Sequence, residues 1–311
     1  MKTTYYMGID GGGTYTRVII TNQKGEIKSH IKYNAGASIK KNPNAIHDVQ
    51  NAICQAIQEA NLNKDDISKI VLGIAGYDSE KDLEWVNELT NIERFTPKII
   101  SLNDAKIAHA ALLLGQPGII CIAGTGSIVL GLNEQGRYIR NYDFYHNAYG
   151  ASRLLSYNFM QHVLAKDYDD SDKEIVETFL NYFNANSIKE LAHQGFEKET
   201  SIRDKQFGDF TKNITEASLK GSQLSQLICD QTANNIVLGM RLVASCFESE
   251  IINVGLIGSV ANCLYIKNKI IELLPTNFKL VESSFPPEIG AILLGMSEVN
   301  EEILNNLKGE I

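Results

Sequence analysis

Apolar runs and short polar turns alternate near the start of the chain. Apolar and β-branched side chains predominate at residues 5–9 and 17–20, and the turn Asp10-Gly11-Gly12-Gly13-Thr14 separates the two runs. Short apolar runs on both sides of a turn are typical of paired β-strands. We therefore predict a strand, a turn and a second strand over residues 5–31, with another turn at 22–25.

The pattern then changes to the period of helices. Residues 43–60 repeat apolar side chains every three or four positions, which predicts an amphipathic helix. A short apolar run at 69–76 predicts a buried strand, and a helix at 80–90, a strand at 98–102 and a helix at 105–114 follow. Strands that alternate with helices predict an α/β lobe.

The opening pattern recurs in the second part of the chain. An apolar run at 119–122 leads into the turn Ala123-Gly124-Thr125-Gly126-Ser127, and a second apolar run follows at 128–132. A repeated pattern of this kind predicts a second lobe of similar plan. We place the lobes at 1–116 and 117–289, with a C-terminal helix at 290–311 that closes the first lobe.

Helical periodicity dominates residues 150–250, which we interpret as an insertion in the second lobe. Strands are predicted at 251–259 and 278–282 with a helix between them, and Pro286-Pro287 opens a final helix. The acidic run at 167–172 lacks the spacing of a calcium-binding EF-hand loop. Ser171 and Glu174 instead have the spacing of a capping box, so we predict a solvated helix start there.

Length and charge restrict the class of protein. A chain of 311 residues favours two lobes over a single core. The formal net charge of −8 argues against a nucleic-acid partner, because binding to a phosphate backbone needs a concentrated basic face. No apolar run reaches the roughly 18 residues that span a bilayer, and Asp10 interrupts any signal peptide. We expect a cytoplasmic protein with no membrane partner.

The five cysteines are odd in number and widely spaced, with no CxxC pair. This pattern favours free thiols at apolar positions over a disulfide framework or a metal-binding set. The cysteines are Cys54, Cys121, Cys229, Cys246 and Cys263.

The two glycine-rich turns are candidate phosphate sites. Glycine lets backbone N–H groups approach phosphate oxygens closely, and Thr14, Thr125 and Ser127 add hydroxyl donors. The Walker pattern GxxxxGK[ST] is absent, and strands rather than a helix follow the glycines, which excludes a dinucleotide fingerprint. Two such turns that face each other across a cleft would suit a polyphosphate.

Two carboxylates near the predicted strand ends are candidates for the chemistry. Asp10 would repel phosphate directly, so we expect it to hold Mg²⁺ through water. Asn103-Asp104 follows a strand and starts a helix, where either residue suits an N-cap. A carboxylate at that strand end could also accept the proton of an attacking hydroxyl. Both roles can hold at once.

Six motifs in order carry a resemblance to a known family. They are Gly8-Ile9-Asp10-Gly11-Gly12-Gly13-Thr14-Tyr15-Thr16, Leu72-Gly73-Ile74-Ala75-Gly76, Asn103-Asp104-Ala105, Ala123-Gly124-Thr125-Gly126-Ser127, Gly255-x-x-Gly258-Ser259 and Pro287-x-x-Gly290-Ala291. The set resembles the BadF/BadG/BcrA/BcrD ATPase family, which includes the N-acetylglucosamine kinases of the actin, hexokinase and Hsp70 superfamily. The resemblance implies two ribonuclease-H-like (actin-like ATPase) lobes with a cleft between them, an ATP·Mg²⁺ site, and a homodimer.

The resemblance also implies roles for individual residues. Asp104 is the implied catalytic base, and Asp10 is the implied contact to Mg²⁺. The residues implied to bind ATP are Gly11, Gly12, Gly13, Thr14, Gly124, Thr125, Gly126, Ser127, Gly258 and Ser259. The residues implied to bind the acceptor sugar are Ser38, Ala75, Gly76, Asn103 and Gly150.

The acceptor half of the family pattern is altered in this chain. Sugar kinases of the family carry a Trp-Gly ahead of a Gly-Asp-Glu-Gly-Ser segment, whereas residues 142–153 keep Gly150 and replace the acidic pair by Ala151 and Ser152. The family's Asn in the loop after the first hairpin is Ser38. Three other side chains of the segment either supply different contacts or are ordinary structural residues. They are Asp143, His146 and Arg153.

Three functions follow from the resemblance. The leading hypothesis is an ATP-dependent kinase that phosphorylates a hydroxyl of an amino sugar, N-acetylglucosamine or a cell-wall relative. The second is the ATPase that drives electron transfer to 2-hydroxyacyl-CoA dehydratases, which needs cysteines for an iron–sulfur cluster. The third is a nucleotide- or sugar-sensing protein that has lost turnover.

Overall fold

The computed structural model describes residues 3–147, 149–194, 199–282 and 285–309. The chain forms two units, Met1–Gln116 together with Val281–Ile311, and Pro117–Leu280. The chain returns to the first unit at Val281, whereas the sequence analysis placed this return at residue 290.

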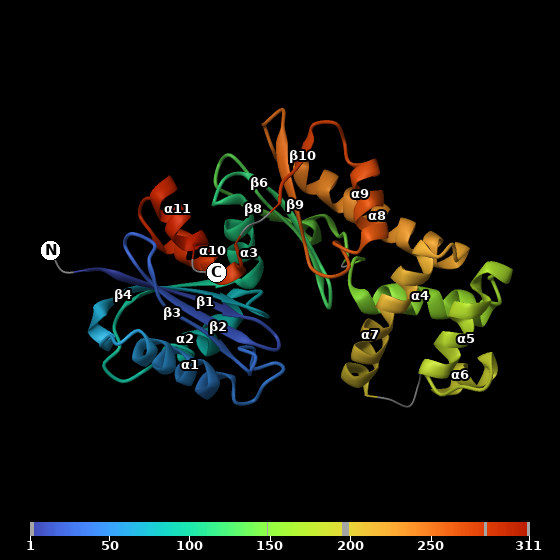
Figure 1. The fold of residues 1–311 in the computed structure, drawn as a ribbon, viewed down its shortest axis with the longest axis horizontal. Helices are drawn as coiled ribbons and strands as arrows, with labels where there is room; N and C mark the ends of the chain where they lie inside the picture. Colours follow the sequence, from blue (N-terminus) through green and yellow to red (C-terminus); the bar gives the residue numbers. More distant parts are fainter. Residues whose placement is uncertain (1–2, 148, 195–198, 283–284, 310–311) are drawn as a thin grey trace. The chain divides into compact units, whose positions relative to one another are not determined.

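A five-stranded sheet with the order β3-β2-β1-β4-β5 forms the centre of the first unit (Figure 1). β1, β2 and β3 are antiparallel neighbours, and β4 and β5 run parallel to β1. Each of these segments contains β-branched residues, which favour strands over helices. The strands are β1 (Tyr5–Gly11), β2 (Thr16–Asn22), β3 (Ile27–Tyr33), β4 (Ile67–Ile74) and β5 (Lys98–Asn103).

Helices cover both faces of this sheet (Figure 1). On one face, α1 buries its apolar stripe in a cluster that also holds Ile9 of β1. Successive side chains of a strand point to opposite faces, so Gly8 and Asp10 belong to the other face. There Gly8 lies against Glu288 and Ile292 of α10. The helices are α1 (Ala45–Glu59), η1 (Lys64–Asp66), η2 (Glu80–Asp82), α2 (Leu83–Glu88), α3 (Asp104–Leu113), α10 (Pro287–Gly295) and α11 (Glu301–Lys308).

The predicted helical segment at 290–311 is wrong as a single element, because two helices form there. α10 ends at Gly295, and Met296 has an extended backbone with φ −74° and ψ 146°. Asn300 then caps α11, since its side chain accepts a hydrogen bond from the Ile303 N–H. A strong N-cap residue competes with helix continuation, which explains the break.

The second unit repeats the plan of the first sheet. Its strand order is β10-β9-β6-β7-β8, so β6 occupies the central position that β1 has in the first sheet. β6, β7 and β8 are antiparallel neighbours, and β9 runs parallel to β6. The short β8 was not predicted. The strands are β6 (Gly118–Ala123), β7 (Ser127–Leu132), β8 (Tyr138–Arg140), β9 (Ile252–Ile257) and β10 (Phe278–Leu280).

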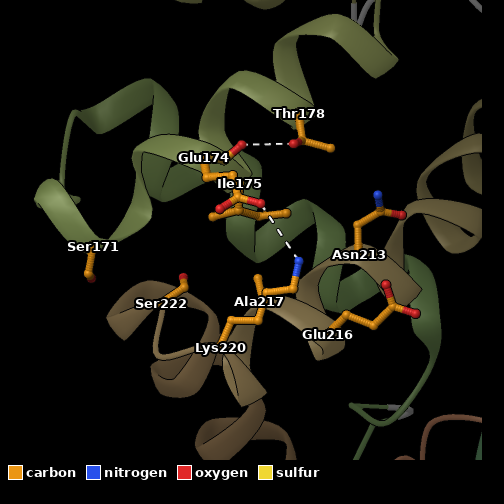
Figure 2. A pocket seen from close by; sticks show the side chains of 9 residues that line it. All are labelled: Ser171, Glu174, Ile175, Thr178, Asn213, Glu216, Ala217, Lys220 and Ser222. Atoms are coloured by element: carbon orange, nitrogen blue, oxygen red, sulfur yellow. Dashed lines mark hydrogen bonds and ion pairs between the residues drawn. The ribbon is translucent and has the colours of Figure 1, made fainter.

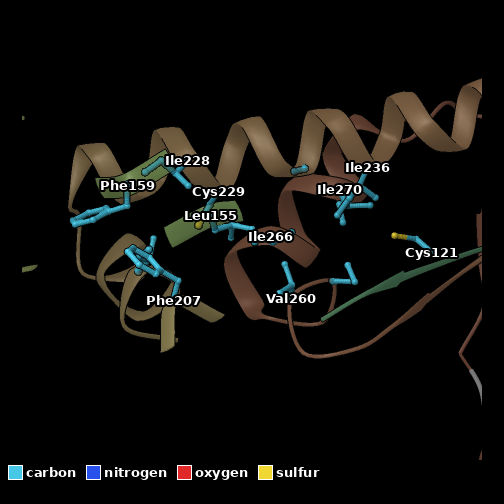
Figure 3. Packing of buried hydrophobic residues seen from close by; sticks show 14 of the residues in the cluster. Cys121, Leu155, Phe159, Phe207, Ile228, Cys229, Ile236, Val260, Ile266 and Ile270 are labelled. Carbon is cyan, nitrogen blue, oxygen red and sulfur yellow. The ribbon is translucent and has the colours of Figure 1, made fainter. Parts of the chain in front are cut away.

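Residues between β8 and β9 are mostly helical, as predicted. A cluster of buried aromatic rings holds α4, α5 and α7 together, with Phe179 5.2 Å from Phe159 and 4.8 Å from Phe210 between ring centroids. The same hydrophobic core continues past Ile228 and Ile266 to Cys121 of β6 (Figure 3). The elements are η3 (Asn141–Phe144), α4 (Ser152–Ala165), η4 (Asp170–Asp172), α5 (Lys173–Tyr182), α6 (Ile188–Gln194), α7 (Thr200–Leu219), α8 (Gln223–Ala244) and α9 (Leu264–Leu273).

The acidic run at 167–172 starts a helix, but the predicted capping box of Ser171 and Glu174 is wrong. Asp169 and Asp172 form the box instead, at the ends of η4. Asp172 is buried and accepts hydrogen bonds from the Ser222 hydroxyl (2.7 Å) and the Leu224 N–H (3.0 Å). This carboxylate therefore serves the packing of α8 as well as the helix start.

Among the described residues, none of the helices combines the length and the apolar composition needed to cross a bilayer.

The close approach of α3 and α10 predicts a large cost for a methyl group at Gly290. A Cβ there would overlap the Ile107 carbonyl oxygen and lie 2.6 Å from the Ala111 nitrogen. Overpacking of this kind costs about 1–3 kcal/mol. Gly290→Ala should therefore lower the melting temperature by several degrees in a calorimetric scan.

Gly309→Ala is the matched control, because the nearest atom to its added Cβ is the Asn305 carbonyl oxygen at 3.6 Å. Equal melting temperatures for the two variants would contradict the proposed packing.

Candidate functional site

Asp10 lies near the end of β1, where the first hairpin turns. Its carboxylate is 7% exposed and forms an ion pair with Arg17, with Nη1 and Oδ2 2.8 Å apart. Asp10 and Arg17 are partners in the register of β1 and β2, so the hairpin itself creates this pair. Sequence analysis missed Arg17, although its position opposite Asp10 follows from the hairpin.

The surroundings of Asp10 oppose its negative charge. The pKa of this carboxyl is raised from 3.8 to about 6, first by burial and then by the nearby Glu288 and Asp104, while Arg17 acts in the opposite direction. A buried carboxylate with other carboxylates nearby is stabilised by an added cation. This environment fits a divalent ion near Asp10.

The first glycine turn is joined to the loop that follows β3. The Gly12 carbonyl accepts a hydrogen bond from Ala37 N–H at 3.0 Å, and a Cβ on Gly11 would lie 2.6 Å from the Ala37 side chain. A Cβ on Gly36 would lie 2.7 Å from the carbonyl carbon of Gly13. Glycine is therefore required at Gly36 by the backbone of Gly13, and at Gly11 by the side chains of Ala37 and Ile74.

The predicted acceptor residues of the first unit come together beside this turn. Ala75 N–H donates to the Gly11 carbonyl at 2.9 Å. Gly76 has a φ of +84°, which favours glycine, and a Cβ there would lie 2.9 Å from the hydroxyl of the buried Ser38. The structure thus brings together the first turn, Ser38, Ala75 and Gly76.

Asn103 and Asp104 connect β5 to α3. Asn103 is the N-cap, since its side chain accepts from the Ala105 N–H at 3.0 Å, and its amide donates to the Tyr77 carbonyl at 3.1 Å. Asp104 is the first residue of α3 and is half-buried. Burial raises the pKa of its carboxyl, Asp78 raises it further, and Lys41 lowers it.

Lys40 binds the loop after β3 to the loop after β4. Its ammonium donates to the Gly76 carbonyl at 2.7 Å and lies 2.9 Å from Asp82 Oδ1. Asp82 also accepts from the backbone N–H groups of Asp78 (3.1 Å) and Ser79 (3.0 Å). Sequence analysis missed this pair, because residues far apart in the chain give no local signal.

A second pair of polar side chains lies on the α10 face of the sheet. Glu288 is 1% exposed, and its Oε1 lies 2.9 Å from His30 Nε2. Its other oxygen has no hydrogen-bond partner among the residues that the structure describes. Sequence analysis did not select either residue.

The second unit builds a similar arrangement around its own glycine turn. Ser152 N–H donates to the Gly124 carbonyl at 2.7 Å, and a Cβ on Gly150 would lie 2.9 Å from the Ser127 hydroxyl. Gly258 has a φ of +96° and lies against the carbonyl of Ala123. Gly124, Ser127, Gly150 and Gly258 are thus brought together.

The exposed positions of the second unit's set are Thr125, Gly126 and Ser259. Apart from its chain neighbours, no described residue has a heavy atom within 4 Å of a Cβ placed on Gly126. A Cβ on Gly124 would lie 3.7 Å from the Ser259 backbone nitrogen. The turn therefore leaves room for a ligand above Gly126 while its base is packed.

The altered segment at 142–153 holds structural contacts. Asp143 pairs with Arg140 at 2.9 Å. His146 is buried, its Nδ1 lies 3.1 Å from the Asn141 amide, and burial lowers its pKa. Arg153 donates to the Thr125 carbonyl at 3.2 Å, which is a contact with the glycine turn itself.

A model of the BadF/BadG/BcrA/BcrD ATPase family matches residues 7–295. The chain belongs to this family. It is 24% identical over 306 residues to an N-acetylmuramic acid/N-acetylglucosamine kinase of Clostridium acetobutylicum, covering 94% of this chain and 99% of the relative. It is 30% identical over 235 residues to the glucosamine kinase GspK of Vibrio cholerae, covering 75% and 78%.

Solved structures share the fold of this chain. A Chromobacterium violaceum protein assigned as an N-acetylglucosamine kinase superimposes with a TM-score of 0.70 at 18% identity, covering 94% of this chain and 99% of that one. A Streptomyces griseus ROK family glucokinase, in complex with glucose and AMPPNP, gives 0.56 at 17% identity, covering 94% and 98%. The predicted family and the α/β class with two actin-like ATPase lobes are confirmed.

The donor groups of this family member fit a magnesium ion held mostly by water. Among the described residues, no group of three or more Asp, Glu, His or Cys side chains could hold a metal. Mg²⁺ usually keeps several waters and uses one or two carboxylates, and Asp10 supplies one. The two glycine turns, with little or no side chain in the way, fit phosphate oxygens.

The cysteines fit the prediction of free thiols. Cys121 and Cys229 are buried, and burial raises the pKa of both thiols to about 12. Because thiolates are the form that binds metals, these two residues are poor ligands for an iron–sulfur cluster.

A hollow of about 230 Å³ lies in the helical part of the second unit (Figure 2). Glu174 and Lys220 form an ion pair 3.7 Å apart at its edge, and Ile175 and Ala217 are among its apolar lining. None of the predicted site residues lines it.

The unfavourable burial of Asp10 predicts that Asp10→Asn stabilises the ligand-free protein near neutral pH. The folded state holds the Asp10 proton up to about pH 6, and the unfolded state releases it near pH 3.8. Stability is therefore lost as pH rises through this window, by about 1.4 kcal/mol per unit of pKa shift, or up to about 3 kcal/mol. Asparagine does not ionise, so Asp10→Asn does not lose this stability as the pH rises.

The measurement is the melting temperature of both proteins at pH 4 and pH 7. The melting temperature of Asp10→Asn relative to that of the wild type should be higher at pH 7 than at pH 4. Asp65→Asn, at an exposed position, is the control. A difference between wild type and Asp10→Asn that does not change with pH would contradict the cause assigned to the shift.

Proposed function

We propose that this protein is an ATP-dependent sugar kinase that transfers the γ-phosphoryl group of ATP to a hydroxyl of an amino sugar. One observation carries the proposal: Asp104, a half-buried carboxylate with a raised pKa, lies at the start of α3 in a chain whose family relatives are amino-sugar kinases. A general base works best when its pKa is closer to the working pH than that of a free carboxylate.

The acceptor that we propose is N-acetylglucosamine or a related cell-wall sugar. The relatives named above act on N-acetylmuramic acid, N-acetylglucosamine and glucosamine by their names. Ser38, Ala75, Gly76 and Asn103 would bind this sugar from the first unit. Gly150 would contribute from the second.

The nucleotide would bind through the glycine turns. Gly11, Gly12, Gly13 and Thr14 would donate to phosphate oxygens from one turn. The second set, Gly124, Thr125, Gly126 and Ser127, would do the same from the other, and Gly258 and Ser259 would receive the base and ribose. Backbone N–H groups and hydroxyls at fixed positions stabilise the developing charge without reorganisation.

Asp10 would hold Mg²⁺ through water. When bound, the ion neutralises phosphate charge and orients the transferred group. Arg17 keeps the Asp10 carboxylate in one orientation through its 2.8 Å ion pair.

Asp104 would accept the proton of the attacking sugar hydroxyl. The bond between the sugar oxygen and phosphorus forms, the bond between phosphorus and the leaving oxygen of ADP breaks, and the proton moves to the Asp104 carboxylate. Asn103 fixes the start of α3 by capping it, so the carboxylate is held at one point. A cytoplasmic location and a homodimer stay predictions.

The role of Asp104 predicts a specific defect in Asp104→Asn. The amide cannot accept the proton, so kcat with an amino sugar should fall by about 10²–10⁴-fold. Because Asp104 is not needed to hold the nucleotide, the affinity for ATP should stay within a few fold. A coupled assay of ADP release over a panel of amino sugars, hexoses and muramic acid derivatives measures both the acceptor and the defect.

Asp65→Asn is the matched control, because Asp65 is an exposed carboxylate in η1, immediately before β4 begins and therefore away from the carboxyl ends of the strands. Full activity of Asp104→Asn toward the acceptor would remove its proposed role. Tight ATP binding by the wild type without phosphorylation of any sugar in the panel would favour the sensing function instead.

A further inference from the structure

Two neighbouring lysines in the loop after β3 have different surroundings. Lys40 is bound to Gly76 and Asp82, as described above. Lys41 is exposed, and no hydrogen bond or ion pair joins its ammonium to another residue that the structure describes. Its Nζ lies 3.6 Å from the point that a Cβ on Gly13 would occupy. An unpaired cation therefore lies against the first glycine turn.

The backbone that carries Lys41 is held within the loop after β3, and this loop is joined to the glycine turn by the hydrogen bond from Ala37 N–H to the Gly12 carbonyl. Lys41 N–H donates to the Ser38 carbonyl at 3.0 Å. The side chain of the next residue, Asn42, donates to the Gly36 carbonyl and to Asp48, each at 2.8 Å. The loop thus fixes the position of the Lys41 backbone relative to the glycine turn, while the lysine side chain itself is flexible.

Lys41 also acts on the carboxylate of Asp104. Its positive charge lowers the pKa of that carboxyl, against the larger effect of burial. Among the described residues, Glu288, Asp78 and Arg17 are the other main charged groups that act on Asp10 or Asp104, and the positive one, Arg17, is already paired with Asp10. Lys41 is therefore a positive charge near both the glycine turn and Asp104 that has no ion-pair partner in the described part of the chain.

We propose that Lys41 is a further catalytic residue, whose ammonium binds an oxygen of the γ-phosphoryl group of ATP during transfer. This inference rests on the proposed function, because it assumes that Gly13 borders the phosphates and that Asp104 faces the acceptor. The transferred group passes between these two places, and a lysine is a point charge that can follow it. Lys41 keeps its proton throughout, and the hydroxyl proton still goes to Asp104.

A comparison of AMPPNP and ADP binding tests this directly. Calorimetric titrations in the presence of Mg²⁺ should show that Lys41→Gln weakens AMPPNP binding about tenfold, as expected for the loss of a charge-assisted hydrogen bond. ADP lacks the γ-phosphoryl group, so its affinity should stay within about twofold of the wild type. Lys41→Arg should keep most of the AMPPNP affinity.

Lys81→Gln is the control for net charge, because Lys81 is exposed in η2 and has no place in the site. With the acceptor found in the sugar panel, Lys41→Gln should lower kcat by about 10–10²-fold and leave the acceptor KM nearly unchanged. A structural role would instead lower the melting temperature and weaken both nucleotides together.

Three results would overturn the inference. The first is equal weakening of AMPPNP and ADP, and the second is unchanged binding and turnover in Lys41→Gln. The third is a higher KM for acidic acceptors with unchanged kcat, which would place Lys41 on the sugar. A wild-type protein that binds neither nucleotide would overturn the proposed function itself, whereas the other results leave that function standing.

Discussion

The buried carboxylate of Asp10 is the constraint on which the first unit depends. The strand β1 carries this side chain to the α10 face, where it is almost fully removed from water and lies near two other acidic residues, Glu288 and Asp104. Arg17 offsets this only in part, since the pKa of Asp10 stays at about 6. A protein that keeps such a charge gives up stability in its free form, and positions of this kind cluster at functional sites. A cation bound together with a polyphosphate would offset the cost of burying the Asp10 charge.

The glycines explain how the loops reach this carboxylate. The first turn, the loop after β3 and the loop after β4 meet through backbone hydrogen bonds such as Ala37 N–H to the Gly12 carbonyl and Ala75 N–H to the Gly11 carbonyl. A side chain at Gly11 or Gly36 would force them apart. The second unit is built in a similar way. Ser152 N–H donates to the Gly124 carbonyl, and Gly258 lies against the Ala123 carbonyl. Close packing of backbone on backbone therefore builds both turns, and it leaves their tips open.

Much of the fold could be predicted from the chain, because its strands and helices follow local periods and the glycine turns repeat. The predicted continuous C-terminal helix was wrong because Asn300 caps a new helix, and the short β8 lacked enough residues to show a period. In the site, the glycine turns could be predicted from their composition, and Asp10 and Asp104 from their places at the ends of predicted strands. Arg17 followed only from the hairpin register. Lys40, Lys41 and Glu288 gain their surroundings from loops and helices distant in the chain, so no spacing rule could select them.

The most direct test of this account is the effect of Mg²⁺ on nucleotide affinity in the wild type and in Asp10→Asn. ATP is titrated into each protein by calorimetry, once with Mg²⁺ and once with a chelator. The account predicts that Mg²⁺ tightens ATP binding by the wild type at least about tenfold, equivalent to about 1.4 kcal/mol, and that most of this gain is lost in the variant. The same gain from Mg²⁺ in both proteins would contradict it, because the buried carboxylate would then have no part in holding the ion.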